Sequence, residues 1–145
     1  MKAQIDINTL LEPFKHKTST KVQFHQVDSF QILHNIQYLY MFENARLEYL
    51  QSLGLANNLS DLINKFPVMT VHHEIDYFSP AYFNDNIDIY TRVKEIGNSS
   101  IKFENIAITN NKLHAKATTV YVYINPLNGD SLPLPQNVRD ILANN

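Results

Sequence analysis

The chain has 145 residues, of which 44% are hydrophobic and 18% charged, with a net charge of −2. This length fits one domain, 1–145, with a sizeable core, and the composition excludes a disordered chain. The near-neutral charge without a basic stripe argues against a nucleic-acid partner, and the lack of cysteine excludes disulfides, thiolate zinc sites and a cysteine nucleophile. No histidine pair has metalloprotease spacing, so we expect no metal and no cofactor. There is no run of about eighteen apolar residues and no signal-peptide pattern at the start, so we expect a cytoplasmic protein without a membrane span.

Two kinds of periodicity divide the first half of the chain. Residues 21–27 alternate polar and apolar side chains, which predicts a half-buried strand. Over 35–53, apolar residues recur at helical steps and Gly54 follows as a stop signal, which predicts a long helix. Because apolar side chains cover this helix almost all round, we expect the rest of the protein to wrap it. A short amphipathic helix is expected over 58–66.

The second half has the pattern of strands joined by tight turns. Alternating apolar residues predict strands over 69–77 and 87–93, and β-branched and aromatic residues predict another over 114–124. Asparagine and glycine mark the expected turns, which lie at 80–86 with Asn84 left-handed, at Gly97-Asn98 and at Asn110-Asn111. A short helix is expected near the C-terminus, over 135–142. The order is therefore one strand, a long apolar helix and then four antiparallel strands, the third of them between the turns at Gly97-Asn98 and Asn110-Asn111, which indicates an α+β fold. The pattern fits the hotdog architecture, a long central helix wrapped by a curved antiparallel sheet of about five strands.

The segment between the first predicted strand and the long helix carries the candidate chemistry. A helix N-terminus presents unpaired N–H groups and the positive end of the helix dipole, which together stabilise a developing oxyanion. The amides near Asn35 supply this function, and the Asp28 carboxylate is placed to attack a carbonyl or to activate water. The competing interpretation is that Asp28 only stabilises the loop or caps the helix start, a common role for aspartate.

Two stretches of the chain resemble a known family. The segment Val22-Gln23-Phe24-His25-Gln26-Val27-Asp28 and the helix with Glu43-Asn44-Ala45-Arg46, ending near Leu53-Gly54, resemble the first motif of the 4-hydroxybenzoyl-CoA thioesterase-like family of hotdog-fold acyl-CoA thioesterases. Ile75-Asp76-Tyr77-Phe78-Ser79-Pro80-Ala81, followed by Asn84-Asp85, is similar to its second motif. The similarity spans roughly residues 20–125.

The resemblance implies an acyl-CoA thioesterase acting on a small-to-medium or aromatic acyl group. Asp28 falls at the catalytic carboxylate, as nucleophile or general base, and Asn35 at the backbone N–H that polarises the carbonyl. Gln31 stands where the family usually has a small residue, often glycine. Two alternatives stay open: a hydratase or dehydratase, for which Asp28 and His34 are the one local carboxylate–histidine pair, and a non-catalytic acyl-thioester binding protein, favoured by the altered Gln31-Ile32 loop.

Further residues are assigned lesser roles. His34, Tyr38 and His73 are candidate substrate-binding residues, with His73 on the apolar face of its strand, where a satisfied core histidine is the alternative. Glu43 and Arg46 are three apart and are expected to pair within the helix. Lys94 and Lys102 flank a turn near which some family members bind CoA phosphates, although surface lysines are usually only solvated.

The resemblance also implies an oligomer. Exposed sheet edges are usually paired or covered, and hotdog families pair them across a two-fold axis. We therefore expect a homodimer or homotetramer, with the 69–77 strand near Asp28 of the partner subunit.

Overall fold

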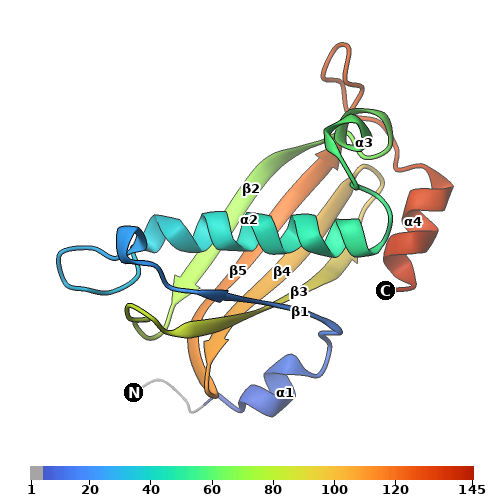
Figure 1. Ribbon diagram of the computed structural model, residues 1–145. Helices are drawn as coiled ribbons and strands as arrows, with labels where there is room; N and C mark the ends of the chain where they lie inside the picture. Colours follow the sequence, from blue (N-terminus) through green and yellow to red (C-terminus); the bar gives the residue numbers. More distant parts are fainter. Residues whose placement is uncertain (1–4) are drawn as a thin grey trace.

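A long helix lies across one face of a five-stranded antiparallel sheet in the computed structural model, which describes residues 5–145 (Figure 1). Residues 1–4, part of the stretch examined for a signal peptide, lie outside the described residues. The sheet order is β1-β3-β4-β5-β2, so β2 and β1 are its two edges. The elements are α1 (Ile7–Leu11), β1 (His16–Lys21), the 3-10 helix η1 (Phe24–Gln26), α2 (Asn35–Ser52), α3 (Leu59–Asn64), β2 (Val68–Tyr77), β3 (Asn86–Ile96), β4 (Ser100–Thr109), β5 (Lys112–Tyr123) and α4 (Gln136–Ala143). The predicted α+β arrangement is confirmed.

Helix α2 begins and ends where the sequence predicts, to within one residue. His34 is its N-cap, accepting the Ile36 N–H at Nδ1, and Gly54 follows the helix with a φ of 76°. The buried side faces the sheet and consists of Tyr38, Met41, Phe42, Ala45, Arg46, Tyr49 and Leu50. Ile36 and Tyr40 are exposed on the other side, so the helix keeps one open face. The sheet curves around only one side of it.

Both faces of the sheet are covered in part. Ile89 of β3 and Ala107 of β4 pack toward α2, in a cluster with Phe42. On the opposite face, Ile106 and Ile108 pack with Phe14 and with the apolar side chains of α1. The sequence pattern did not predict α1, because five residues are too short to show a helical repeat.

The first predicted strand, over 21–27, is wrong. The strand of this region is β1, which pairs antiparallel with β3, and the chain turns away from the sheet after Lys21 and forms η1. Val22 is buried whereas Phe24 is exposed, so the alternation reflects a turn and not a pleat. The β1 sequence, His-Lys-Thr-Ser-Thr-Lys, lacks the apolar residues that reveal a strand.

The turns follow the sequence with one exception. Asn84, Asn110 and Asn111 adopt the predicted left-handed backbone, with φ values of 72°, 48° and 63°. The link between β3 and β4 covers three residues, 97–99, and Gly97 has no left-handed backbone, so the expected two-residue turn there is wrong. Within residues 5–145, no helix combines the length and apolarity needed to cross a membrane.

Candidate active site

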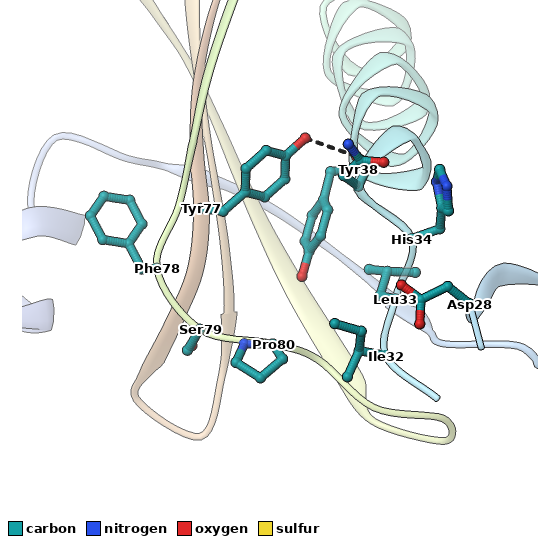
Figure 2. Close-up of a pocket in the computed structure, with 10 residues that line it drawn as sticks. Asp28, Ile32, Leu33, His34, Tyr38, Tyr77, Phe78, Ser79 and Pro80 are labelled. Atoms are coloured by element: carbon teal, nitrogen blue, oxygen red, sulfur yellow. Dashed lines mark hydrogen bonds between the residues drawn. The ribbon is translucent and has the colours of Figure 1, made fainter. Parts of the chain in front are cut away.

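A pocket of about 440 Å³ lies at the N-terminal end of α2, between the loop that precedes the helix and the turn that follows β2 (Figure 2). Four of the five predicted site residues line it, namely Asp28, His34, Asn35 and Tyr38. The remaining wall is mainly apolar and comprises Ile32, Leu33, Tyr77, Phe78, Ser79 and Pro80. A concave apolar site with a few polar groups is the usual form of a small-molecule site.

The loop before α2 is a tight backbone structure. Asp28 N–H donates to the Ile32 carbonyl at 2.9 Å, and Gln31 N–H donates to the Asp28 carbonyl, also at 2.9 Å. Gln31 has a φ of 64°, in the left-handed region that favours glycine. This backbone is a physical reason for the small residue that the resemblance implies at this position, and Gln31 adopts the same conformation despite its side chain.

The Asp28 carboxylate is half-buried and only partly used by the loop. Its Oδ1 accepts the Phe30 N–H at 2.8 Å, which makes Asp28 a capping residue of the loop and not of the helix. Its Oδ2 makes no hydrogen bond with any residue of the described range 5–145. One carboxylate oxygen thus fixes the loop, and the other is available to the pocket.

The start of α2 offers a hydrogen-bond donor to the same pocket. Asn35 is the first helical residue, so its N–H has no partner within the helix, and none of the other described residues accepts from it. The next N–H, that of Ile36, is already taken by Asn35 Oδ1 at 2.9 Å and by His34 Nδ1 at 3.2 Å. The Asn35 N–H is therefore the free donor at this helix end.

His34 does not form the predicted pair with Asp28. Its Nδ1 accepts a hydrogen bond as the helix cap, and its backbone N–H donates to Gln26. No hydrogen bond or ion pair joins His34 to Asp28 in the described part of the chain. The carboxylate–histidine pair needed by the hydratase alternative is not assembled here.

Two tyrosines form the wall beside the helix start. Burial, reinforced by Tyr77 and the Asp85 carboxylate, raises the pKa of Tyr38 to about 12, and burial also raises the pKa of Tyr77. The two rings meet edge to face with centroids 5.5 Å apart. The Tyr77 hydroxyl donates to the Asn35 carbonyl at 3.0 Å, which ties the end of β2 to the first turn of α2 (dashed line in Figure 2). Both tyrosines remain protonated at neutral pH.

His73 is not among the residues that line this pocket, and its role in substrate binding stays a prediction. It lies opposite Thr119 in the register of β2 and β5, and its Nδ1 is 3.0 Å from the Thr119 hydroxyl. This position is beside the middle of α2, not beside its N-terminus. Burial and the nearby Arg46 guanidinium lower the pKa of His73.

Arg46 forms a buried polar network that the sequence did not reveal. The side chain is 2% exposed and donates from Nε to the Tyr121 hydroxyl at 2.8 Å. It also donates to Asn105 Oδ1 at 3.1 Å and to the Thr119 hydroxyl at 3.2 Å. No ion pair joins it to Glu43 among the described residues, so the predicted intrahelical pair is wrong. The physical reason is that Arg46 faces the sheet, whereas Glu43 is exposed.

The two lysines considered for CoA phosphates are engaged in ion pairs. Lys94 Nζ is 3.7 Å from the carboxylate of the buried Glu104, and Lys102 Nζ is 3.4 Å from Glu95. Neither residue lines the pocket at the start of α2. The geometry of this chain therefore gives them no role in that pocket.

Comparison with known proteins defines the class of the chain. The model of the thioesterase-like superfamily matches residues 22–142, and the chain belongs to this superfamily of thioester hydrolases. The acyl-CoA thioesterase YbgC of Haemophilus influenzae is 31% identical over 100 residues, which cover 68% of this chain and 72% of that protein. The resemblance inferred from the sequence motifs is confirmed.

Solved structures agree with this assignment. A thioesterase from Thermus thermophilus, complexed with coenzyme A and Zn, superposes with a TM-score of 0.80 at 25% identity, covering 92% of this chain and 95% of that one. The structure of a predicted thioesterase from Bacillus stearothermophilus has a TM-score of 0.80 at 25% identity, covering 89% and 94%. The hotdog fold expected from the sequence is confirmed.

Proposed function

We propose that this chain is a cytoplasmic enzyme that hydrolyses acyl-CoA thioesters in the pocket at the start of α2. The observation that carries the proposal is that a carboxylate with an available oxygen, on Asp28, and an unpaired helical N–H, on Asn35, line one apolar pocket. The likeness to an acyl-CoA thioesterase and to a coenzyme A-bound thioesterase structure supports the choice of CoA as the thiol.

The chemistry assigned to the two groups is complementary. The thioester carbonyl oxygen accepts from the Asn35 N–H, where the helix dipole stabilises the negative charge of the tetrahedral intermediate. Asp28 either attacks the carbonyl carbon, forming an anhydride that water then hydrolyses, or removes a proton from the attacking water. In both routes the C–S bond breaks, the thiolate of CoA leaves and is protonated, and the acid is released.

The pocket favours a small-to-medium or aromatic acyl group. Its volume of about 440 Å³ lies toward the lower end of the range for small-molecule sites. Ile32, Leu33 and Pro80 give it an apolar wall, and two tyrosine rings form the side against α2. We infer that the acyl group carries no negative charge, since the pocket lining contains no lysine or arginine that would pair with it.

The direct test is turnover of a panel of acyl-CoAs. Purified protein is incubated with short, medium and aromatic acyl-CoAs and a thiol reagent, while the acyl products are analysed by mass spectrometry. Release of free CoA with the matching acid is the expected result. Hydration or dehydration of the acyl chain without CoA release contradicts hydrolysis, and saturable binding without any product identifies a non-catalytic binding protein.

We also propose that β2 pairs with a second copy of the chain, in a homodimer or homotetramer. β2 pairs only with β5 among the described strands, and Met69 and Val71 along it are 53% and 59% exposed. An open edge of this length invites strand pairing. Pairing there places the 68–77 strand near Asp28 of the partner subunit. Light scattering at micromolar concentration is expected to give at least a dimeric mass, and a monomeric mass contradicts the proposal.

A further inference from the structure

One hydroxyl of the pocket has no protein partner. Tyr38 is 3% exposed, lines the pocket, and forms no hydrogen bond through its hydroxyl with any residue of 5–145. Figure 2 shows its ring extending from α2 toward Ile32 and Pro80, with the hydroxyl at the far end of the ring. The hydroxyl oxygen is not one of the fully buried unpaired atoms of residues 5–145, so it reaches the pocket space, where a polar group without a protein partner hydrogen-bonds to water or to a ligand.

The other polar side chains of the pocket each make a hydrogen bond within the protein. The Tyr77 hydroxyl donates to the Asn35 carbonyl, and the Ser79 hydroxyl donates to the Leu113 carbonyl. His34 caps the helix, and Asp28 holds the loop with one oxygen. The unused side-chain N–H donors of His34 and Asn35 lie at the start of α2, where the thioester binds, so the Tyr38 hydroxyl is the side-chain donor left for the remote part of a substrate among the described lining residues.

We propose that Tyr38 determines specificity by donating a hydrogen bond to an oxygen on the part of the acyl group remote from the thioester. This inference rests on the proposed acyl-CoA hydrolysis and narrows its substrate to acyl groups that carry a hydroxyl or carbonyl oxygen there. The thioester carbonyl lies at the Asn35 N–H, and the acyl group extends from it past the tyrosine ring. The remote oxygen of the acyl group then lies beside the apolar wall of Ile32 and Pro80, where the Tyr38 hydroxyl donates to it.

The environment keeps this hydroxyl a donor. Burial and the neighbouring Asp85 carboxylate both disfavour the phenolate, so the proton is retained well above neutral pH. A site that holds a buried hydrogen-bonding group discriminates against a ligand that leaves the group unpaired. An apolar acyl group of the same size leaves the hydroxyl unpaired and is the disfavoured substrate.

The test compares matched substrate pairs on the wild type and on Tyr38→Phe, which removes the hydroxyl and keeps the ring. Each pair is an acyl-CoA with a terminal hydroxyl and its analogue with methyl in that place: ω-hydroxyacyl-CoAs from hydroxybutyryl to hydroxyoctanoyl, and para-hydroxyphenylacetyl-CoA against para-methylphenylacetyl-CoA. The measured quantity is the ratio of kcat/KM within a pair. We expect at least one pair to favour the hydroxyl in the wild type, and Tyr38→Phe to lower that ratio by about fivefold or more.

Tyr40→Phe is the matched control. It removes a phenolic hydroxyl from the same helix, at a position that is 58% exposed and outside this pocket, and its ratio is expected to equal that of the wild type. A ratio that changes less than about twofold in Tyr38→Phe overturns the inference. Equal loss on both members of every pair also overturns it, because the hydroxyl then acts on the thioester or on packing.

Failure of the proposed function gives a different result. If the wild type hydrolyses none of these thioesters, the same ratios are measured as dissociation constants by calorimetry. A wild-type preference for the hydroxyl member that Tyr38→Phe abolishes then supports the Tyr38 contact in a binding protein, and an unchanged binding ratio overturns it. Hydrolysis with an unchanged ratio leaves the proposed function intact and refutes only the role of Tyr38.

Discussion

Helix α2 carries two polar regions about two turns apart that differ in how their hydrogen bonds are satisfied. Around Arg46, the Nε and Nη1 groups of the guanidinium donate to side-chain oxygens from two strands, so these groups are satisfied within the protein. Around Asp28 and Tyr38, a carboxylate oxygen, a helical N–H and a hydroxyl face a pocket without protein partners. Buried polar groups that hydrogen-bond to one another stabilise the fold, whereas polar groups without protein partners beside an apolar cavity are available to a ligand.

The largest expected effect is on stability, at the Arg46 network. Arg46→Met keeps an unbranched side chain but leaves the oxygens of Asn105, Thr119 and Tyr121 without their donor. We expect the free energy of unfolding to fall by about 3 kcal/mol, because each unpaired buried group costs about 1–3 kcal/mol. Urea denaturation measures the change, with Lys17→Met at the exposed edge as control, expected within about 0.5 kcal/mol of wild type. A loss below about 1 kcal/mol means that the network adds little to stability.

At the pocket, Asp28→Asn should lower activity while leaving stability nearly unchanged, the opposite of the result expected for Arg46→Met. The amide oxygen of asparagine retains the bond from the Phe30 N–H, so the loop and the melting temperature should change little. The basicity of the carboxylate is lost, and kcat on the best acyl-CoA is expected to fall at least about 10²-fold. A folded variant that keeps more than about a third of the wild-type kcat removes Asp28 from the chemistry.

A smaller effect is expected at Gln31, where the backbone is left-handed. Gln31→Gly should raise the free energy of unfolding by about 0.5–1 kcal/mol, since relief of the left-handed strain exceeds the added chain entropy of glycine. Gln51→Gly, at an exposed position inside α2, provides the control and should lower it by about 1 kcal/mol. Thermal unfolding measures both variants. Destabilisation by both substitutions would show that Gln31 makes a favourable contact that outweighs its backbone cost.

The smallest effect concerns pH and His114, which packs behind the pocket wall. Its Nδ1 lies 3.1 Å from the Ser79 carbonyl, and burial lowers its pKa from the ordinary 6.5. Below pH 6.5 the unfolded chain therefore binds a proton at this histidine more readily than the folded chain does. The contribution of neutral His114 to the free energy of unfolding is complete above pH 6.5 and is lost as the pH falls toward the lower pKa of the folded state. For one histidine, the free energy of unfolding lost by pH 6 is less than about 1 kcal/mol.

Urea midpoints at pH 7 and pH 6 test this effect. His114→Asn retains a donor near the Ser79 carbonyl and should show a smaller decrease in stability between the two pH values than the wild type. The exposed His25→Asn should keep the wild-type decrease. Equal decreases in all three proteins would show that His114 does not contribute.

Much of the fold could be predicted because its signals are local. The spacing of apolar residues over 35–53 and the stop at Gly54 locate α2, and asparagine marks the turns at Asn84 and Asn110-Asn111. β1 could not be predicted, because a polar edge strand owes its pairing to β3 and not to its own side chains. The same limit misplaced the first strand at 21–27.

The site was only partly predictable for the same reason. Asp28, Asn35 and Tyr38 are close in sequence, so the motif that contains them also brings them to one pocket. The contribution of Ser79 and Pro80 depends on how β2 ends beside α2, and the partners of Arg46 come from β4 and β5. Such contacts join residues far apart in the chain and leave no periodic signal.

The spacing of Tyr38 and Arg46 limits which insertions and deletions the gene can tolerate. The two residues are eight positions apart, so both side chains point toward the sheet from one side of the helix. One residue added between them would turn Tyr38 by about 100° and move it about 1.5 Å along the axis, while Arg46 held the rest of the helix in place. Insertions and deletions should be tolerated in the loop around Leu127, which is 94% exposed. The segment from 38 to 46 should keep its length in variants that retain a functional pocket.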